Sequence, residues 1–331
     1  MRRTALCAAL ALAIVLQAVA FAAPAAPKFV IGAQYSDVGE GEYVVQQMKS
    51  EGGDYFEVAL PQGRTLHVLD SKAYPGVRIV YTGTRAGMEN ASQASVIMAM
   101  LPEEFRPDVV LHSGLAGNAG DGSIGDIYLN RYFVLANLGT RYQVTFEPRP
   151  SATYDPALND VTEIVYFPAD ERLIEIGKIA FERYKQDPEI AALEAGLRPE
   201  GQPLLLLTEY VGASSNWFVA SSDVVETWKL LYSVRPPEHA IDYPGEKFYR
   251  TVQKTLPLGT VDMESAAAAK AFFEFGIPFA AARFPVDSAR ELAVEQMDLY
   301  WAHAARIGGG FMWEWIKAVA EYISDPNNPL W

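Results

Sequence analysis

Five short apolar segments, separated by longer helix-like stretches, restrict the fold of this chain more than any other feature. The segments span residues 28–35, 77–83, 107–117, 202–212 and 277–284, and three of them end in glycine. Runs of this kind are typical of buried strands in a parallel or mixed sheet. Helical spacing of apolar residues covers 90–105, 170–186 and 263–276, and Gly276 is placed to end the last of these helices.

Strands that alternate with helices predict an α/β fold, specifically a three-layer α/β/α sandwich around a central mixed sheet. The chain shows no internal repeat, low-complexity segment or linker, so residues 23–331 are expected to form a single domain. Two stretches, 145–165 and 233–250, read as long ordered loops. Loops of that length in a compact domain are usually functional or peripheral.

The first 22 residues have the layout of a secretory signal peptide. Arg2 and Arg3 precede an apolar core, and small residues then favour cleavage after Ala22. We therefore expect export to the periplasm or the medium, with an uncleaved membrane anchor as the alternative. Cys7, the single cysteine, lies in this segment, so the mature protein would have no disulfide and would depend on its core for stability.

Charge and histidine spacing exclude several classes of partner. The net charge is −14, which would become −16 after the loss of Arg2 and Arg3, and an acidic surface repels nucleic acid. No later apolar run approaches the roughly 20 residues of a membrane span, so no membrane partner is expected after signal cleavage. The histidines at positions 67, 112, 239 and 303 lack metal-ligand spacing, and neither a metal nor a redox cofactor is expected.

Two glycine-containing segments follow predicted strands, where ligands of α/β proteins collect. The first, "TGTRAGMENAS" (82–92), contains Gly83 and Gly87, whose bare backbone would allow N–H groups to approach an anion or a sugar hydroxyl. A tight turn without a ligand is the alternative. The second, "HSGLAGNAGDGSIGDIYL" (112–129), would admit a flat ligand against its backbone, or would be a flexible surface loop.

Three acidic residues lie beside apolar runs rather than on an evidently solvated face. Asp262 and Glu264 open the predicted helix over 263–276, and Asp287 follows the apolar run that begins at Ile277. Carboxylates at a helix start are favoured by its dipole and free N–H groups, so Asp262 and Asp287 could simply cap two helices. Alternatively, Asp287 lies at the carboxyl end of a strand, where a ligand would bind.

Taken together, these segments resemble the nucleoside phosphorylase and nucleosidase superfamily, and most of all its methylthioadenosine/S-adenosylhomocysteine nucleosidase branch. The likeness lies in "FVIGAQYSD", in "GLAGNAGDGSIGDI" and in "TVDMESAAAAKAFFEFGIPFAAAR" with the following Asp287. The order and spacing of these motifs hold from about residue 28 to residue 320, whereas 130–200 and 220–258 show no readable likeness. The resemblance implies a nucleoside phosphorylase-like sandwich that acts on a small-molecule nucleoside.

The resemblance also implies roles for particular residues. Asp287 matches the general acid that protonates the departing purine near N7, and Glu264 matches the glutamate that binds the ribose hydroxyls. Cleavage of an N-glycosidic bond needs both functions, because its transition state resembles the oxocarbenium ion of glycoside hydrolysis. Other residues are implied to contact the substrate, by packing beside the ribose, stacking on the base, lining the glycine loops or holding an anion. They are Met263, Phe218 or its neighbour Trp217, Ala116, Gly117, Gly87 and Arg85.

The nucleophile is expected to be water. Phosphorylases of the superfamily hold phosphate with arginines in the first loop and before the glycine loop, but here the first loop has none and His112 stands at the second place. The nucleosidases activate water with a glutamate after the first strand; Asp37 aligns with it, and Glu40 is a second candidate.

Other readings stay open at this point. Arg85 could restore a phosphate site, which would make the protein a phosphorylase. Val286, Pro285 and Leu115 depart from the nucleosidase pattern, and they leave room for a nucleoside-binding or storage protein without activity. Relatives form homo-oligomers in which a neighbour's loop closes the site, and the stretch 145–158, with Phe146 and Tyr154, could supply such a loop.

Overall fold

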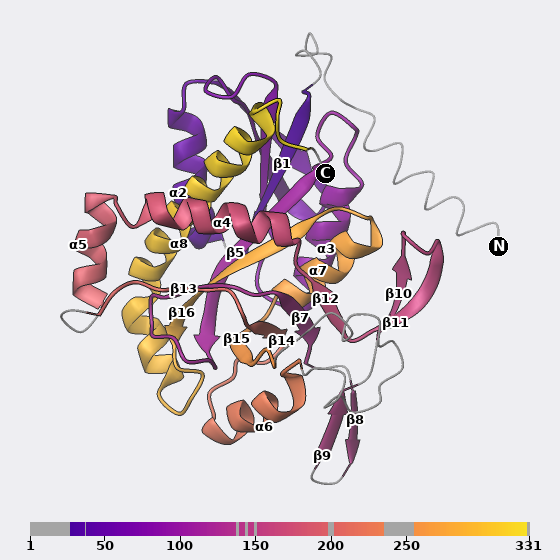
Figure 1. Ribbon diagram of the computed structural model, residues 1–331, viewed down its shortest axis with the longest axis vertical. Coiled ribbons are helices and arrows are strands. Elements are labelled where there is room, and N and C mark those ends of the chain that lie inside the picture. Colours follow the sequence, from indigo (N-terminus) through magenta and orange to yellow (C-terminus); the bar gives the residue numbers. More distant parts are fainter. Residues whose placement is uncertain are drawn as a thin grey trace.

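The computed structural model of the protein describes residues 27–36, 38–136, 139–142, 145–148, 151–197, 202–234 and 255–329. Within these residues, twelve strands form one large mixed sheet with helices on both faces (Figure 1). The predicted α/β sandwich is therefore confirmed.

The centre of the sheet is built from the segments that the sequence marks as buried strands. β1 (Phe29–Tyr35) runs parallel to β4 (Val77–Gly83) on one side and to β5 (Val109–Asn118) on the other. β5 also pairs in parallel with β16 (Phe279–Asp287) and antiparallel with β15 (Leu258–Asp262). Because β1, β5 and β16 run in the same direction, their carboxyl ends meet at one edge of the sheet, where ligands bind in such folds.

Further strands extend the sheet at both ends. On the β4 side these are β3 (Arg64–Asp70) and β2 (Asp54–Leu60), with a short 3₁₀ turn (Pro61–Gly63) between them. On the β15 side they are β14 (Val211–Ser214), β7 (Tyr132–Leu135) and β12 (Tyr166–Pro168). β6 (Ile127–Leu129) pairs with β16 and with β13 (Leu206–Leu207).

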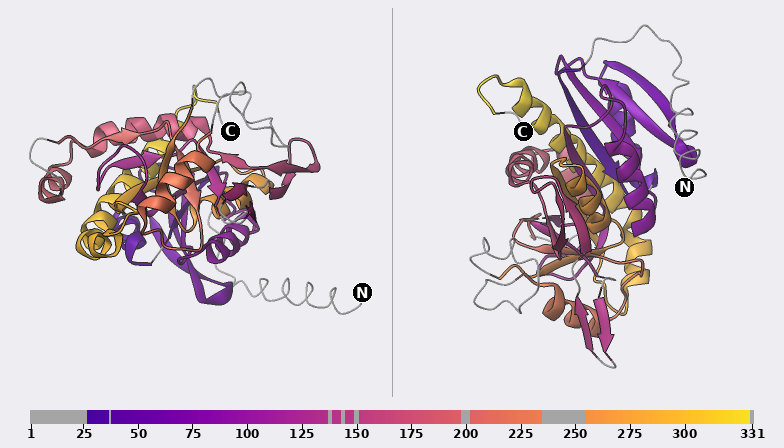
Figure 2. Two further views of the ribbon diagram at one scale, coloured as in Figure 1. Left: turned by 90° about the horizontal axis from the view of Figure 1, so that it is seen from below. Right: turned by 90° about the vertical axis from the view of Figure 1, so that its right-hand side faces the viewer.

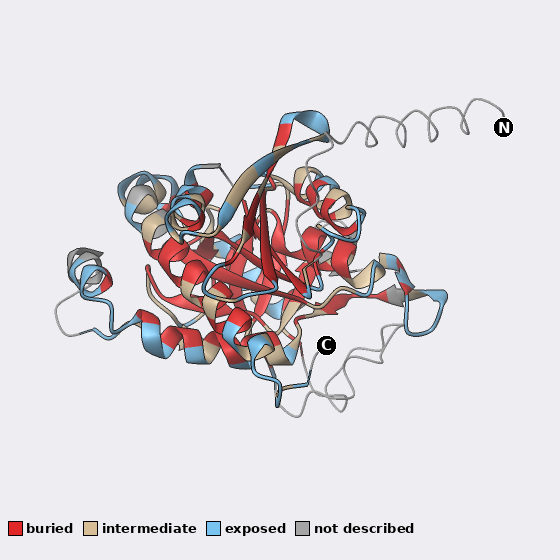
Figure 3. Ribbon diagram, turned by 90° about the horizontal axis from the view of Figure 1, so that it is seen from above, coloured by how far each residue is buried: buried red, intermediate tan, exposed pale blue. Residues whose placement is uncertain are grey.

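Helices cover the sheet in two layers. One face contacts α2 (Val38–Ser50) and α8 (Ala293–Ser324), and α4 (Glu171–Tyr184) packs against α8. α3 (Met88–Ala99) and α7 (Ser265–Glu274) contact each other, and α7 packs on β7, β12 and β14. The remaining helices are α5 (Pro188–Leu197), which contacts α8, and α6 (Ser222–Tyr232), which contacts β15. Figure 3 shows buried residues throughout the central strands and on the inward faces of the helices.

The long helix α8 packs closely against its neighbours at three consecutive glycines, Gly308 against β16, Gly309 against α2 and Gly310 against α4. A methyl group on Gly308 would come within 2.9 Å of the Phe284 ring, and one on Gly309 within 2.8 Å of Tyr43 Cβ. Beyond the glycines, the fully buried Trp315 donates from its ring nitrogen to the carbonyl oxygen of Leu173. None of the described helices is both long and apolar enough to cross a membrane.

Three expectations about elements need correction. Residues 202–212 are not one strand: the chain pairs with β6 as β13 and then crosses to β7 and β15 as β14, so no single ladder can hold the whole run. The helix predicted over 90–105 ends at Ala99, shortly before Pro102, which cannot continue it.

The predicted loop over 145–165 instead contains strands. β10 (Ser151–Asp155) and β11 (Asp160–Ile164) form a hairpin, as do β8 (Gly139–Tyr142) and β9 (Thr145–Pro148), and both hairpins project from the body of the protein (Figure 2). Most of the other predicted loop, 233–250, lies outside the described residues, as does the signal-like segment 1–22.

Candidate active site

A cleft opens beside the carboxyl ends of β1, β5, β15 and β16. Four carboxylic acids line it: Glu40, Asp262, Glu264 and Asp287. No lysine, arginine or histidine is among the described lining residues. The cleft is therefore acidic, and it contains all three acids that the sequence sets apart.

Asp287 is the last residue of β16 and is only 1% exposed. A register shift between Pro285 and Asp287 separates it from the regular ladder with β5. Its Oδ1 accepts the Ala289 backbone N–H at 2.6 Å, and Ala289 adopts a positive φ of 52° at this turn. Burial raises the pKa of Asp287 to about 6, although this hydrogen bond opposes the shift.

The alternative role of Asp287, as a helix cap, is wrong. The next helix begins at Ala293 with Leu292 at its cap position, five residues after Asp287. A raised carboxyl pKa in a cleft is the property expected of a general acid.

Asp262, in contrast, does cap the helix that follows it. Its Oδ1 accepts the backbone N–H groups of Glu264 and Ser265, each at 2.9 Å, and the hydroxyl of Ser214 at 2.6 Å. The residue thereby satisfies donors at the start of α7, which begins at Ser265. It also fixes the backbone that presents Glu264.

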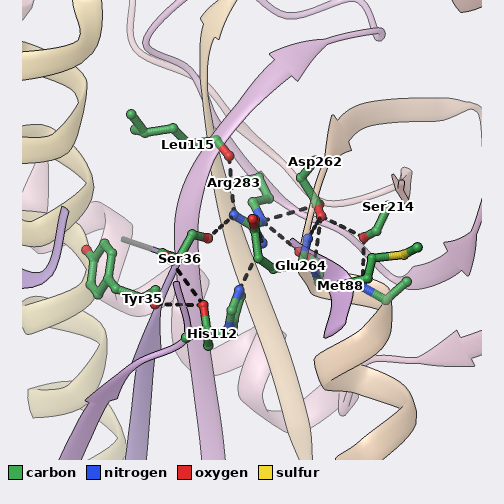
Figure 4. A network of polar contacts seen from close by, with 12 residues as sticks. Tyr35, Ser36, Met88, His112, Leu115, Ser214, Asp262, Glu264 and Arg283 are labelled. Carbon is green, nitrogen blue, oxygen red and sulfur yellow. Dashed lines mark hydrogen bonds and ion pairs between the residues drawn. The ribbon is translucent and has the colours of Figure 1, made fainter. Parts of the chain in front are cut away.

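Glu264 is 4% exposed, and its two carboxylate oxygens are held on different sides. Oε1 accepts the Gly87 backbone N–H at 3.1 Å, and Oε2 lies 3.3 Å from a terminal nitrogen of Arg283 (Figure 4). Burial raises the pKa of Glu264, and the positive charge of Arg283 works against that shift. Gly87, expected to contact the ligand, thus acts on Glu264 and is not itself part of the cleft lining.

Arg283 lies directly beneath the cleft and is fully buried on β16. Its Nε donates to the Ser265 hydroxyl at 2.6 Å and pairs with Asp262 at 3.3 Å. One terminal nitrogen donates to the hydroxyl of Ser36 at 2.8 Å and to the carbonyl oxygen of Leu115 at 3.2 Å. Arg283 is not among the site residues predicted from the sequence, although an arginine inside an apolar strand run is itself a signal, because burying one requires partners.

The apolar walls of the cleft include most of the predicted contact residues. Met263, Ala116 and Gly117 line it, as do Trp217 and Phe218. Phe218 is 44% exposed and Trp217 is 69% exposed, so neither ring is a core residue.

Gly117 has a structural reason to be glycine, since a Cβ there would lie 2.9 Å from Asp287 Oδ1 and 2.8 Å from the Ala289 Cβ. Met297 and Trp301, one helical turn apart on α8, complete the apolar wall. Neither residue is predicted from the sequence, because both follow the helical spacing of an ordinary apolar face.

Of the two candidate bases, Glu40 lies in the cleft, and Asp37 lies outside the described residues. Glu40 is in the first turn of α2 and is 3% exposed. Its Oε2 accepts the Leu115 backbone N–H at 3.1 Å. Since the carbonyl oxygen of Leu115 accepts from Arg283, this one peptide segment links Glu40 to the buried polar network.

Arg85 does not line the cleft, contrary to the expectation of an anion-binding residue there. It is exposed, and its guanidinium donates to the carbonyl oxygens of Gln62 and Gly63 at 3.2 and 3.5 Å. These contacts join the loop after β4 to the turn between β2 and β3. Tyr154 is in the β10–β11 hairpin and bonds to Asn159, whereas the side chain of Phe146 is outside the described set.

No group of three or more metal-ligating side chains occurs among the described residues. The side chains that line the cleft instead suit a neutral organic ligand with hydroxyl groups, held between carboxylates and aromatic rings.

Comparison with solved structures shows that this α/β fold is of the nucleoside phosphorylase-like class. The solved nucleosidase of S. pneumoniae that acts on 5′-methylthioadenosine and S-adenosylhomocysteine superposes with a TM-score of 0.60, at 18% identity, over 88% of this chain and 100% of the other. Native futalosine hydrolase of Helicobacter pylori gives a TM-score of 0.58 at 18% identity, over 87% of this chain and 97% of the other.

At the level of sequence, this chain is similar to the 5′-methylthioadenosine/S-adenosylhomocysteine nucleosidase of Listeria monocytogenes. The two are 24% identical over 249 residues, which cover 74% of this chain and 83% of the relative. No family model matches the chain. The chain thus has the nucleoside phosphorylase/nucleosidase fold, and the proteins named here are described as two nucleosidases and a futalosine hydrolase.

Proposed function

We propose that this protein is an exported N-ribosyl hydrolase that cleaves the N-glycosidic bond of purine nucleosides, of adenosine type or modified at the 5′ position. One observation carries the proposal: two buried carboxyl groups with different surroundings face the same aromatic-walled cleft. Asp287 is buried beside a backbone N–H, and Glu264 is buried beside a guanidinium. Such a pair can supply an acid and an anion to one substrate.

In the proposed reaction, Asp287 donates its proton to the purine ring as the bond from the ring nitrogen to the ribose C1′ breaks. The bonding electrons leave with the base, and positive charge develops on the ribose. Glu264 accepts hydrogen bonds from the ribose hydroxyls and stabilises that charge. Water then adds to C1′, and a carboxylate takes its proton. Glu40 is the described residue placed for this last step, because it lines the cleft beside Leu115.

The charges of the cleft favour water over phosphate as the nucleophile. Four carboxylic acids and no cationic side chain are found among its described lining residues, so a phosphate dianion would be repelled. Arg283 is close, but all of its N–H groups bind acceptors within the protein. Arg85 is tied to two carbonyl groups outside the cleft.

The test is to incubate the purified protein with a panel of purine nucleosides, with and without phosphate, and to measure free base and sugar by chromatography. Hydrolysis predicts equal release of base in both buffers, with free ribose or a 5′-modified ribose as the second product. Release that depends on phosphate, with a ribose 1-phosphate product, would instead support a phosphorylase. Binding of adenosine by calorimetry without any base release would support a nucleoside-binding protein.

Export and self-association belong to the same proposal. The layout of residues 1–22 supports export, and expression of the full chain followed by cell fractionation and mass measurement of the mature N-terminus tests it. Light scattering on the purified protein tests for a homo-oligomer.

A further inference from the structure

His112 stands behind the candidate active site without touching the cleft. It lies within β5, is fully buried, and in the sheet register is flanked by Gln34 of β1 and Ala281 of β16. It is absent from the cleft lining, so it does not contact a bound substrate directly. Its contact with the site is indirect: Nε2 lies 2.9 Å from a terminal nitrogen of Arg283 (Figure 4).

This contact defines the tautomer and the charge of the His112 imidazole. A guanidinium has only donors, so His112 Nε2 must be the acceptor, and the ring proton is on Nδ1. Burial lowers the pKa of His112 well below its ordinary value, and the nearby charge of Arg283 lowers it further. The ring is therefore neutral, as an acceptor must be.

His112 also completes the hydrogen bonding of Arg283. A guanidinium carries five N–H groups. Four of them reach the hydroxyls of Ser265 and Ser36, the carbonyl oxygen of Leu115 and the carboxylate of Glu264. The fifth reaches His112. Because the guanidinium is planar and rigid, five acceptors around it allow the Arg283 side chain only one orientation.

The nitrogen that His112 accepts from is the same one that holds Glu264. Without an acceptor on its far side, that nitrogen would keep a buried, unpaired N–H, which is costly for a charged group. The guanidinium would then rotate towards the other acceptors and draw the carboxylate of Glu264 with it. The position of Glu264 relative to the cleft thus depends on a residue that never reaches the cleft.

We propose that His112 is a positioning residue for ribose recognition, acting through Arg283 on Glu264. The inference rests on the proposed function, in which Glu264 binds the ribose hydroxyls. It assigns to His112 an effect on the sugar and none on the base, since Asp287 and the aromatic wall do not contact Arg283 in the described contacts.

A matched pair of variants tests this assignment. His112→Gln places an amide oxygen at about the distance of the histidine Nε2, whereas His112→Met has nearly the same length and shape without a strong acceptor. His303→Leu, at an exposed position of α8 outside the cleft, controls for loss of a histidine elsewhere. Two ligands are compared by calorimetry: a carbon-linked adenosine analogue that cannot be hydrolysed, and free adenine.

We expect His112→Met to weaken binding of the nucleoside analogue about tenfold or more, the effect of an unpaired buried donor, and to leave adenine binding within about threefold. His112→Gln should restore the analogue affinity, and kcat/KM should follow the same order. Equal losses for adenine and the analogue, or a His112→Met variant that matches the wild type, would overturn the assignment. Should the wild type bind the analogue but cleave no nucleoside, the proposed function fails, and the affinity comparison still decides the role of His112.

Discussion

Replacement of Asp287 by asparagine gives the sharpest test of the proposed mechanism, because the structure predicts opposite effects on activity and stability. Asparagine keeps the shape of the side chain and an oxygen that can accept the Ala289 N–H. It removes the proton that the acid would donate and the negative charge of the ionised form. We expect kcat/KM to fall at least about a hundredfold, the usual contribution of a positioned general acid.

The pH dependence gives a second measure of the same group. With the pKa of Asp287 at about 6, roughly half of the free enzyme carries the proton at that pH. Above it, the protonated fraction falls about tenfold for each pH unit. The wild-type kcat/KM should decline accordingly from about pH 6 to pH 8, and the residual activity of Asp287→Asn should lack this limb.

The stability of Asp287→Asn should rise, whereas its activity should fall. Folding raises the pKa of Asp287 from 3.8 to about 6, so the folded state binds the proton more tightly than the unfolded chain. The buried carboxylate therefore destabilises the fold as the pH rises through this window, and the full effect is reached above about pH 6. Two pKa units correspond to about 3 kcal/mol as an upper bound. Asp287→Asn should be more stable than the wild type at pH 8, and the difference should vanish below about pH 4.

The assays are base release from a purine nucleoside across pH 5–8 and urea denaturation at pH 4 and pH 8. Asp223→Asn, in the exposed first turn of α6, is the control and should change neither. An Asp287→Asn variant with wild-type rates would remove this residue from the mechanism. A variant that lost both activity and stability at pH 8 would show that the carboxylate is structural.

Three further substitutions test the other acids. Glu264→Gln should lower kcat/KM about tenfold or more and raise KM for nucleosides, since it removes the charge that faces Arg283 and the ribose; unchanged kinetics would contradict the sugar role. Glu40→Gln should lower kcat about a hundredfold if it activates water, and a larger loss in Asp37→Asn would transfer that role to Asp37. Asp262→Ala leaves the Glu264 and Ser265 N–H groups without their acceptor and removes one carboxylate from the buried Arg283, so it should lower the free energy of unfolding by at least about 1–2 kcal/mol, measured by urea denaturation; an unchanged midpoint would show that these contacts are dispensable.

The central sheet could be predicted because its strands are buried on both faces and are therefore mostly apolar in sequence. β1, β4, β5 and β16 all fall on apolar runs that the sequence marks as strands. β2 and β3 did not stand out, because β2 mixes exposed with half-buried positions and β3 mixes half-buried with buried ones, so neither is a continuous apolar run. The split of 202–212 into β13 and β14 depends on which strands lie on either side, and that information is not local.

In the candidate site, too, some residues could be predicted from the sequence and others could not. Asp287, Glu264 and Met263 could be selected because each follows or opens a recognisable strand or helix, and the structure places all three around one cleft. Met297 and Trp301 could not, since their spacing on α8 is that of any amphipathic helix packed on a sheet. Their position at the cleft results from how far α8 extends beyond the sheet edge.

The separation of Asp287 from Glu264 explains how two buried carboxyl groups in one cleft can have different functions. Arg283 reaches Asp262 and Glu264 from beneath, so two of the four acids share one cation. Asp287 ends the strand that carries Arg283, yet the turn after Pro285 directs it to the Ala289 N–H. A carboxyl group held by one backbone donor in a buried site keeps its proton more readily than one held by a guanidinium. In the proposed mechanism, the register shift at the end of β16 would be the feature that makes one acid a proton donor and the other an anionic sugar ligand, and a substitution that removed the shift would be expected to remove this difference.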